Sequence, residues 1–236
     1  MGSEISSHDL RYREDTDNPA CASGYEIQKR VTDVLVAALA TAIFAPLMAV
    51  IAIAVKLSSQ GPVFFVQPRE VGRAGKVFAL YKFRTMRHNS DSAMHRKYCE
   101  QLIAGKADTY RDGSAGADVF KIVNDPRITR LGRILRRTGL DELPQLINVL
   151  KGDMSVVGPR PAIWYEYDAY TERQRARLSV LPGITGLAQV TVRNSVPFET
   201  MIDIDLEYIR TRSWWLDLTI MAKTAINLVL GRCLGN

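Results

Sequence analysis

The chain has 236 residues, of which 47% are hydrophobic and 24% are charged, a balance that excludes a largely disordered protein. This length allows one substantial domain with a hydrophobic core, with or without appendages. A net charge of +6 favours phosphate-bearing partners or an anionic membrane surface, but the basic residues lack the density of a dedicated nucleic-acid-binding arm. The three cysteines and three histidines form no zinc-ligand pattern, so we expect a reduced, cytosol-facing protein without a structural metal.

Residues 1–24 are polar and mixed in charge, and they show no apolar periodicity. We therefore predict a flexible tail. Because no apolar stretch follows Met1 directly, the tail does not have the pattern of a signal peptide.

The next segment, residues 34–55, reads VLVAALATAIFAPLMAVIAIAV and has 22 residues without a charge. As a straight helix it would be about 33 Å long, which is enough to cross a bilayer core of roughly 30 Å. Core helices of soluble proteins rarely stay apolar on every face for this length, so the pattern predicts a membrane segment. Pro46 divides it into arms of 12 and 9 residues, and its missing backbone donor predicts a kink.

Basic residues flank the apolar segment on both sides, with Lys29 and Arg30 before it and Lys56 after it. Because basic flanks stay on the cytoplasmic side of a membrane, both ends are expected to face the cytoplasm. We therefore predict that residues 25–57 form a re-entrant helix-break-helix that is embedded in one leaflet and hinged at Pro46. A single kinked helix that spans the bilayer is the alternative.

Residues 58–86 carry two runs of aromatic and β-branched residues, PVFFVQ and KVFALYKF, separated by a stretch that contains the glycines of VGRAGK. This pattern predicts a β-hairpin. Residues 88–118 are polar, and we expect one helix near 91–104 followed by an exposed loop through DGSAGAD.

An arginine-rich helix is predicted for the stretch NDPRITRLGRILRRTGL. Its apolar positions follow helical spacing and are Ile128, Leu131, Ile134 and Leu135. The opposite face carries five arginines, which are Arg127, Arg130, Arg133, Arg136 and Arg137. A solvated basic face is the usual interpretation of such a run, but this run lies directly before an acidic pair.

The acidic pair is Asp141 and Glu142, at the start of DELPQLINVLK. Four apolar residues of this stretch follow the spacing of one buried helix face, Leu143, Leu146, Ile147 and Leu150. Since Pro144 is tolerated only in a first turn, the two carboxylates are expected at or beside the helix N-terminus, where backbone N–H groups favour anions.

Asp141 alone would be interpreted as a helix N-cap. Two adjacent carboxylates with Arg136 and Arg137 on one side and Arg160 on the other favour phosphoryl transfer instead. That chemistry needs an oxygen nucleophile, a Mg²⁺ ligand and guanidinium groups that hold phosphate.

Arg160 lies in GDMSVVGPRP, where Pro159 and Pro161 fix φ on either side of it. A rigid turn that presents an arginine favours phosphate recognition. A structural turn with an exposed arginine is the alternative.

The C-terminal third is predicted to be mostly helical. WYEYDAYTERQRARLSV has the pattern of an amphipathic helix, and LPGITGLAQVTVRNS that of a loop with a short extended piece. Trp214 and Trp215 precede a helix that places Leu218, Met221, Ala222, Ala225 and Leu228 or Val229 on one face. This helix is predicted to lie on the membrane surface, with a core helix under a tryptophan lid as the alternative.

Several of these stretches resemble, in the same order, the bacterial sugar transferases, which are monotopic polyprenol-phosphate phosphoglycosyl transferases. They are KRVTDVLVAALATAIFAPLMAVIAIAVKL, GPVFFVQPREVGRAGKVFALYKFRTM, LRRTGLDELPQLINVLKGDMSVVGPRP and LPGITGLAQV, and the resemblance extends from residue 29 to about residue 232. The family's re-entrant helix breaks at a Ser-Pro pair, whereas Ala45 precedes Pro46 here. The chain therefore lacks one hydroxyl that would bind the freed backbone groups.

The resemblance implies transfer of a sugar 1-phosphate from a UDP-sugar to undecaprenyl phosphate, with release of UMP. This is the first membrane step of surface polysaccharide or glycoconjugate assembly. The resemblance also implies that Asp141 is a nucleophile that forms a covalent phosphosugar intermediate, and that Glu142 supports the site and, with Asp141, a Mg²⁺ ion. Arg136 and Arg160 correspond to phosphate-binding residues of the family, and the neighbouring Arg137 completes the candidate site.

We therefore expect an α+β, predominantly helical protein with a membrane-embedded N-terminal segment, a small β-hairpin, cytosolic catalytic helices and interfacial amphipathic helices. The expected division is a tail (1–24), a re-entrant membrane helix (25–57) and a cytosolic catalytic domain (58–236) with residues 88–118 as a variable insertion. We expect it at the bacterial inner membrane, facing the cytosol, with inner-leaflet phospholipids as partners and no nucleic acid. A homodimer is an option that only analogy with the family suggests.

Two other functions use the same residues differently. In a membrane-anchored scaffold without catalysis, the acidic pair would cap a helix and the arginines would bind anionic lipid. A membrane-tethered nucleic-acid binder is disfavoured because the chain lacks interleaved aromatic and basic residues. Release of UMP from a UDP-sugar separates the enzyme from both.

Overall fold

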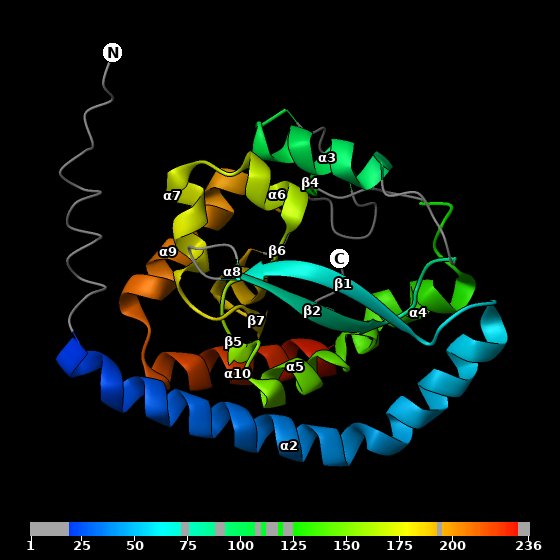
Figure 1. Ribbon diagram of the computed structural model, residues 1–236, viewed down its shortest axis with the longest axis horizontal. Coiled ribbons are helices and arrows are strands. Elements are labelled where there is room, and N and C mark those ends of the chain that lie inside the picture. The colour runs from blue at the N-terminus through cyan, green and yellow to red at the C-terminus, as the bar shows by residue number, and fades with distance from the viewer. Residues whose placement is uncertain are drawn as a thin grey trace.

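The computed structural model describes residues 19–71, 76–87, 93–106, 110–111, 118–119, 125–192 and 195–230. One long helix, α2, lies along the lower edge of a unit built of short helices and strands (Figure 1). The elements are, in chain order, α2 (Pro19–Ser58), β1 (Phe64–Val71), β2 (Lys76–Phe83), α3 (Ala93–Ile103), β3 (Tyr110–Arg111), β4 (Asp118–Val119), α4 (Arg130–Thr138), the 3₁₀ helix η1 (Leu140–Glu142), α5 (Gln145–Lys151), β5 (Ser155–Val157), β6 (Ala162–Ile163), α6 (Trp164–Ala169), α7 (Glu172–Arg175), the 3₁₀ helix η2 (Ala176–Ser179), β7 (Gly183–Thr185), α8 (Leu187–Thr191), α9 (Phe198–Thr211) and α10 (Trp214–Val229). A mostly helical fold with small sheets was predicted, and it is confirmed.

Helix α2 has 40 residues and continues through Pro46 without interruption. Figure 1 shows the helix curving, so that its C-terminal part rises beside the strands. The expected helix-break-helix is therefore a curved, continuous helix, which a long helix adopts when it loses a single backbone bond at proline. The re-entrant topology itself stays a prediction.

Most of the apolar surface of α2 is left uncovered by the rest of the protein. One side packs inward through Ala37, Ile51 and Val55, which are at most 5% exposed. Other apolar side chains are more than 60% exposed, among them Leu35, Leu39, Ile43, Val50 and Ile53. By length and composition, Gly24–Ser58 is able to cross a membrane. Because so much exposed apolar surface is unfavourable in water, α2 is compatible with membrane insertion.

The predicted β-hairpin is confirmed. Strands β1 and β2 pair antiparallel from Phe64↔Phe83 to Val71↔Lys76, and β6 joins the other edge of β1. The alternation of β2 buries Phe78 and Leu80 in one hydrophobic cluster, and Phe83 at the end of the strand is buried in another, against α2 and α4. The connection between β1 and β2, residues 72–75, lies outside the described residues.

Helix α3 confirms the helix predicted near 91–104. It packs on α6, where His95 Nδ1 lies 2.7 Å from the Tyr165 hydroxyl and Cys99 is buried against Ile163 and Tyr165. The loop predicted after α3 falls mostly outside the described residues.

The buried face predicted for residues 143–150 is partly wrong. Leu146 is buried, but Ile147 and Leu150 are 38% and 36% exposed, and Asn148 is fully buried instead. Asn148 faces inward because its side chain pairs with the edge of β2: Nδ2 donates to Ala79 O (2.7 Å) and Oδ1 accepts from Tyr81 N (3.1 Å). A spacing rule for apolar residues does not detect an amide in this role.

One other helix prediction also differs from the structure. The amphipathic helix expected after Arg160 is divided into α6, α7 and η2, because Tyr170 takes an extended conformation after α6. In α10 the buried residues are Asp217 and Ile220, whereas Leu228 and Val229 are exposed. Asp217 is drawn inward by polar partners that lie far away in the sequence.

In α4 the predicted apolar face is only partly buried. Leu135 is 2% exposed, but Ile134 is 59% exposed. Position 134 lies about 100° around the helix axis from Leu135, which is the side that faces away from the core.

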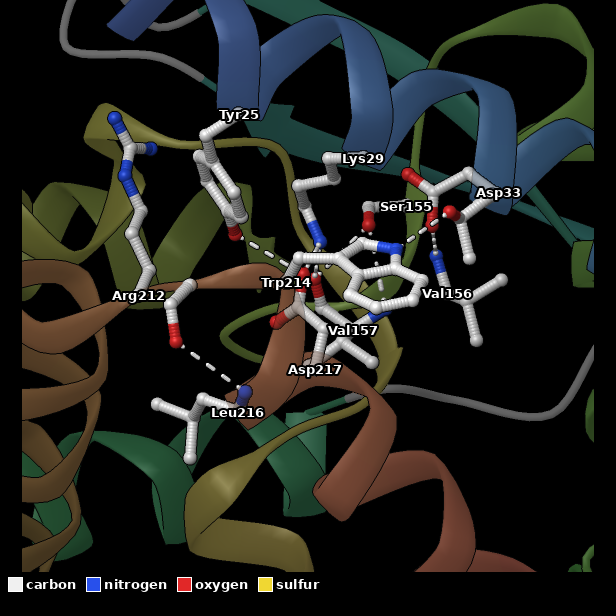
Figure 2. A network of polar contacts seen from close by, with 12 residues as sticks. Tyr25, Lys29, Asp33, Ser155, Val156, Val157, Arg212, Trp214, Leu216 and Asp217 are labelled. Carbon is white, nitrogen blue, oxygen red and sulfur yellow. Dashed lines mark hydrogen bonds and ion pairs between the residues drawn. The ribbon is translucent and has the colours of Figure 1, made fainter. Parts of the chain in front are cut away.

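The residues predicted to flank the membrane segment have partners inside the protein. Lys29 Nζ forms an ion pair with Asp217 at 2.8 Å, and Arg30 donates to Val149 O (2.6 Å) and Leu150 O (3.0 Å) at the end of α5. Figure 2 shows Lys29 pointing from α2 toward Asp217.

The other three flanking residues differ in their surroundings. Lys56 Nζ lies 3.4 Å from Gly61 O, and Trp214 Nε1 donates to Thr32 Oγ1 at 3.0 Å. Trp215 is 73% exposed. The membrane-flanking role of these residues and of Lys29 and Arg30 stays a prediction.

Candidate active site

The acidic pair lies in a tight connection between α4 and α5. Helix α4 ends at Gly139, whose φ of 71° is in the left-handed region that glycine tolerates. The chain then forms η1, which contains Asp141 and Glu142, and Pro144 opens α5. The pair therefore lies beside the start of α5, as the position of the proline predicted.

Helix α4 is held close to the end of the hairpin. Thr129 caps it, with Oγ1 accepting from Gly132 N (2.9 Å), and Thr129 N donates to Thr85 O (3.0 Å). A Cβ atom at Gly132 would lie 2.0 Å from Thr85 O, so the close approach requires glycine. This packing sets the position of Arg136, whose Nε donates to Thr85 Oγ1 at 2.9 Å.

Asp141 is 6% exposed. Burial raises the pKa of its carboxyl, the neighbouring Glu142 carboxylate raises it further, and Lys82 and Arg136 oppose the rise. A buried carboxylate that stays ionised beside cations is a stronger nucleophile than one in water.

Glu142 is held differently from Asp141. Its Oε1 lies 2.6 Å from Lys82 Nζ of β2, with side chains 25% and 14% exposed. Burial raises the pKa of Glu142, but Lys82, Arg160 and Arg69 lower it more, and the net pKa is below the ordinary value. Two adjacent carboxyl groups with oppositely shifted pKa values can serve different roles.

The peptide on each side of Arg160 is fixed by hydrogen bonds. Gly158 N donates to Thr185 O (2.9 Å), and Pro159 O accepts from Gly183 N (2.9 Å). After the arginine, Pro161 O accepts from Arg69 Nη1 at 2.7 Å. Arg160 itself is half-buried. Its backbone is therefore held in place, while part of the residue remains accessible.

The structure brings Asp141, Glu142, Arg136 and Arg160 into one cluster. Arg136 interacts electrostatically with Asp141 and Arg160, and burial lowers its pKa. Arg137 is exposed on the last turn of α4 and faces about 100° away from Arg136, so it is placed less favourably for the same ligand.

The sequence pattern missed four charged residues of the cluster, Lys82, Arg69, Asp125 and Arg127. Asp125 and Arg127 form a two-pronged pair, with Nη2–Oδ2 at 2.6 Å and Nε–Oδ1 at 2.8 Å, and Arg127 lowers the pKa of Asp125. Lys82 and Arg69 come from neighbouring strands of the hairpin, and no local spacing rule connects them to residue 141. A basic residue inside an otherwise apolar strand, as in KVFALYKF, was the one available signal.

The donor set fits Mg²⁺ if a substrate supplies further ligands. In the described part of the chain no group of three or more His, Cys, Asp or Glu side chains forms a metal site. Mg²⁺ commonly binds one or two carboxylates and completes its shell with water and substrate phosphate. Asp141 and Glu142 are the carboxylates that would hold it.

A buried carboxylate beside a second acid and several guanidinium groups is an arrangement that can bind phosphate. The sequence matches the family described as Bacterial sugar transferase over residues 24–231, and the chain belongs to this family.

Three relatives illustrate the family. The chain is 40% identical to an uncharacterized sugar transferase of Haemophilus influenzae, over 96% of this chain and 45% of that one. It is 40% identical to the undecaprenyl-phosphate galactose phosphotransferase of Salmonella typhimurium, over 94% of this chain and 44% of that one. It is 41% identical to the UDP-glucose:undecaprenyl-phosphate glucose-1-phosphate transferase of Caulobacter vibrioides, over 86% of this chain and 70% of that one. The chain thus spans less than half the length of two of these relatives.

Proposed function

We propose that the protein is an undecaprenyl-phosphate hexose-1-phosphate transferase. It moves a sugar 1-phosphate from a UDP-sugar to undecaprenyl phosphate and releases UMP. The observation that carries the proposal is Asp141, a carboxylate with 6% exposure, next to Glu142 and under the influence of Lys82 and Arg136. The names of the Salmonella and Caulobacter relatives support the lipid acceptor and the class of donor.

In the first step, a carboxylate oxygen of Asp141 attacks the phosphorus that bears the sugar. A P–O bond to that phosphorus forms, the P–O bond to the bridging oxygen breaks, and UMP leaves with the bonding electrons. The product is a phosphosugar-aspartate. Arg136 and Arg160 neutralise the diphosphate as negative charge moves onto the leaving UMP.

In the second step, a phosphate oxygen of undecaprenyl phosphate attacks the same phosphorus. The P–O bond to Asp141 breaks, the carboxylate is regenerated, and a polyprenyl-diphosphate sugar results. Because the transfer is divided in two, donor and acceptor need not occupy the site together.

Mg²⁺ held by Asp141 and Glu142 would neutralise phosphate charge during both steps. Glu142 is suited to this second-carboxylate role because Lys82, Arg160 and Arg69 favour its ionised form. Lys82 also keeps Glu142 in place through their 2.6 Å ion pair.

Helix α2 would hold this site at the surface of a membrane. Its exposed apolar side chains would lie among acyl chains in a re-entrant arrangement, and the unit with the acidic pair would face the cytosol. The catalytic carboxylate then meets a soluble nucleotide sugar from one side and the phosphate of a lipid from the other. This fits the bacterial inner membrane and the first membrane step of surface polysaccharide or glycoconjugate assembly.

The test is UMP release from a panel of UDP-sugars in the presence of Mg²⁺ and undecaprenyl phosphate. UDP-glucose, UDP-galactose and their N-acetylated forms cover the donors that the sequence leaves open. Wild type is expected to release UMP from one donor only when the lipid is present, and Asp141→Asn is expected to release none. Asp168→Asn, an exposed carboxylate on α6, is the matched control and should behave as wild type.

Trapping the intermediate separates a nucleophile from a metal ligand. With donor but no lipid, intact-protein mass spectrometry should detect wild type carrying one sugar phosphate, attached at Asp141 after proteolysis. Substantial turnover by Asp141→Asn would remove Asp141 from the nucleophile role. No UMP from any donor, with no adduct, would favour the scaffold hypothesis.

A further inference from the structure

A buried polar cluster joins the beginning of α2 to the strand that precedes Arg160 (Figure 2). It consists of Tyr25 and Lys29 of α2, Val157 of β5, Tyr208 of α9 and Asp217 of α10, and we call it the α2–β5 cluster. Tyr208 and Asp217 are 2% and 4% exposed. The reaction proposed above uses none of these five residues.

The contacts of the cluster converge on one backbone carbonyl. Lys29 Nζ donates to Val157 O at 2.9 Å and pairs with Asp217 Oδ2 at 2.8 Å. The Tyr208 hydroxyl lies 3.2 Å from Val157 O and 2.8 Å from Asp217 Oδ1, and it shares its proton between them. Tyr25 donates to Asp217 Oδ2 at 3.0 Å and also forms a side-chain hydrogen bond with Tyr208, and no bond from Tyr25 to β5 is seen among the described residues.

Val156, the residue before Val157 in β5, is also bound by a side chain of α2. Asp33 Oδ1 of α2 accepts from Val156 N at 2.9 Å. Strand β5 pairs with β7 alone in a two-stranded sheet, so the polar groups of its other edge need partners from elsewhere. Asp33 of α2 binds Val156 N and Lys29 of α2 binds Val157 O, and Ser155 Oγ of β5 also donates to Val157 O at 2.9 Å.

The backbone between Val157 and Arg160 is tightly packed. Gly158 and Gly183 are packed so closely that a Cβ on either would lie within 2.8 Å of the other's backbone. Gly158 N and Pro159 O are both bonded to the β7 region. The segment from Val157 to Arg160 is therefore short and closely packed against the β7 region.

We propose that Lys29 and Tyr208 are positioning residues for Arg160. By holding the Val157 carbonyl they tie the membrane helix to the place where the guanidinium meets a phosphate. The inference rests on the proposed function in one respect, the phosphate-binding role of Arg160. Lys29 would then have a second role besides flanking the membrane segment.

Two tyrosines of the cluster provide a matched pair of variants. Tyr208→Phe removes a hydroxyl that contacts both Asp217 and Val157 O, and Tyr25→Phe removes one that contacts Asp217 and Tyr208 but not Val157 O. Lys29→Met alone is unsuitable, because it leaves the buried Asp217 carboxylate without its cation and risks unfolding. Both tyrosine variants retain the ion pair and are expected to fold.

The first measurement is hydrogen exchange of the full chain in detergent or nanodiscs, followed by mass spectrometry. In Tyr208→Phe the backbone amides of residues 155–160 should exchange about fivefold faster than in wild type, the effect of losing one neutral hydrogen bond. Tyr25→Phe should leave this peptide unchanged. Equal exchange of the peptide in the two variants would overturn the inference, whether or not the protein turns over a donor.

The second measurement is a double-mutant cycle on kcat/KM for the UDP-sugar. Tyr208→Phe should lower kcat/KM about fivefold in the wild-type background and by less than about twofold when Arg160 is already Met. An equal loss in both backgrounds would show a general structural effect and overturn the inference. If wild type releases no UMP from any donor, the proposed function fails and the exchange comparison still decides the positioning role.

Discussion

Asp141 and Glu142 are neighbours in the chain but meet different surroundings. The first is almost fully buried, and burial raises its pKa. The second forms a short ion pair with Lys82, and the nearby cations lower its pKa. A carboxylate with a raised pKa is a better nucleophile. A carboxylate with a lowered pKa stays ionised to lower pH and can bind a metal or an arginine.

Replacing Lys82 tests this division of roles. Asp141 must be ionised to attack phosphorus, so activity falls as the pH falls through its pKa. Lys82 lowers that pKa, and its removal should therefore raise the pKa and move the acid limb of the kcat/KM profile to higher pH. In Lys82→Met, we also expect activity at neutral pH to fall about tenfold or more, because Glu142 loses its partner.

Lys82→Arg is the control, since it keeps the charge but changes the shape of the donor. The profile of this variant should keep its acid limb near that of wild type. An unchanged acid limb in Lys82→Met would show that Lys82 does not set the ionisation of the nucleophile.

At the scale of elements, the site depends on how closely α4 approaches the end of the hairpin. The contact between Gly132 and Thr85 leaves no room for a methyl group, since a Cβ would lie 2.0 Å from the carbonyl oxygen. The same Thr85 binds Arg136 through its hydroxyl. The packing of α4 and the placement of Arg136 therefore share one residue, Thr85.

We predict that Gly132→Ala lowers the free energy of unfolding by about 2 kcal/mol, because overpacking forces the helix away from the strand. UMP release should also fall, since Arg136 moves with α4. Gly24→Ala is the control, because a Cβ there meets nothing within 4 Å. Thermal unfolding in detergent measures the difference, and equal midpoints for the two variants would contradict the prediction.

Helix α5 is joined to the sheet through the side chain of Asn148. Asn148→Ala leaves Ala79 O and Tyr81 N without their side-chain partner. We expect a loss of about 3 kcal/mol in the free energy of unfolding, because two backbone groups lose a buried bond. The exposed neighbour Ile147, changed to Ala, should cost far less. Thermal unfolding and the exchange rate of the Tyr81 amide would both report the effect.

At the scale of the whole molecule, the two sides of α2 have different surroundings. Its inner side packs on the unit that carries the acidic pair, and its outer side presents apolar residues along most of its length. Exposed apolar side chains contribute little to the folded protein but strongly to membrane partition.

We predict that Leu39→Lys combined with Ile43→Lys releases the protein from membranes without unfolding it. These side chains are 63% and 61% exposed, so the fold loses few contacts. Ile27→Lys, 66% exposed but outside the apolar segment, is the control and should stay bound. Flotation with liposomes measures binding, and equal flotation of the two proteins would argue against insertion of α2.

The re-entrant prediction has its own test at this scale. Single cysteines placed near residues 27 and 57 should both react with an impermeant reagent only from the cytoplasmic side. Labelling of the first from the periplasm would establish a spanning helix instead. Pro46→Leu should favour the spanning form, because a straighter helix is long enough to cross.

The sequence alone determined the features that depend on neighbours in the chain. The hairpin followed from its alternating runs, the helix at 93–103 from its periodicity, and the long apolar helix from an unbroken apolar stretch. The acidic pair beside a proline located the start of α5. Local spacing determines these because secondary structure repeats over a few residues.

Only the tertiary structure decided which partners the side chains meet. Lys82 reaches Glu142 across 60 residues of sequence, and Lys29 reaches Asp217 across 188. Asn148 and Asp217 are buried because they bond to polar groups of distant elements, and Asn148 therefore occupies a place on α5 that the apolar spacing did not predict. Such pairings depend on how the elements pack in three dimensions, and no periodic pattern in the chain encodes them.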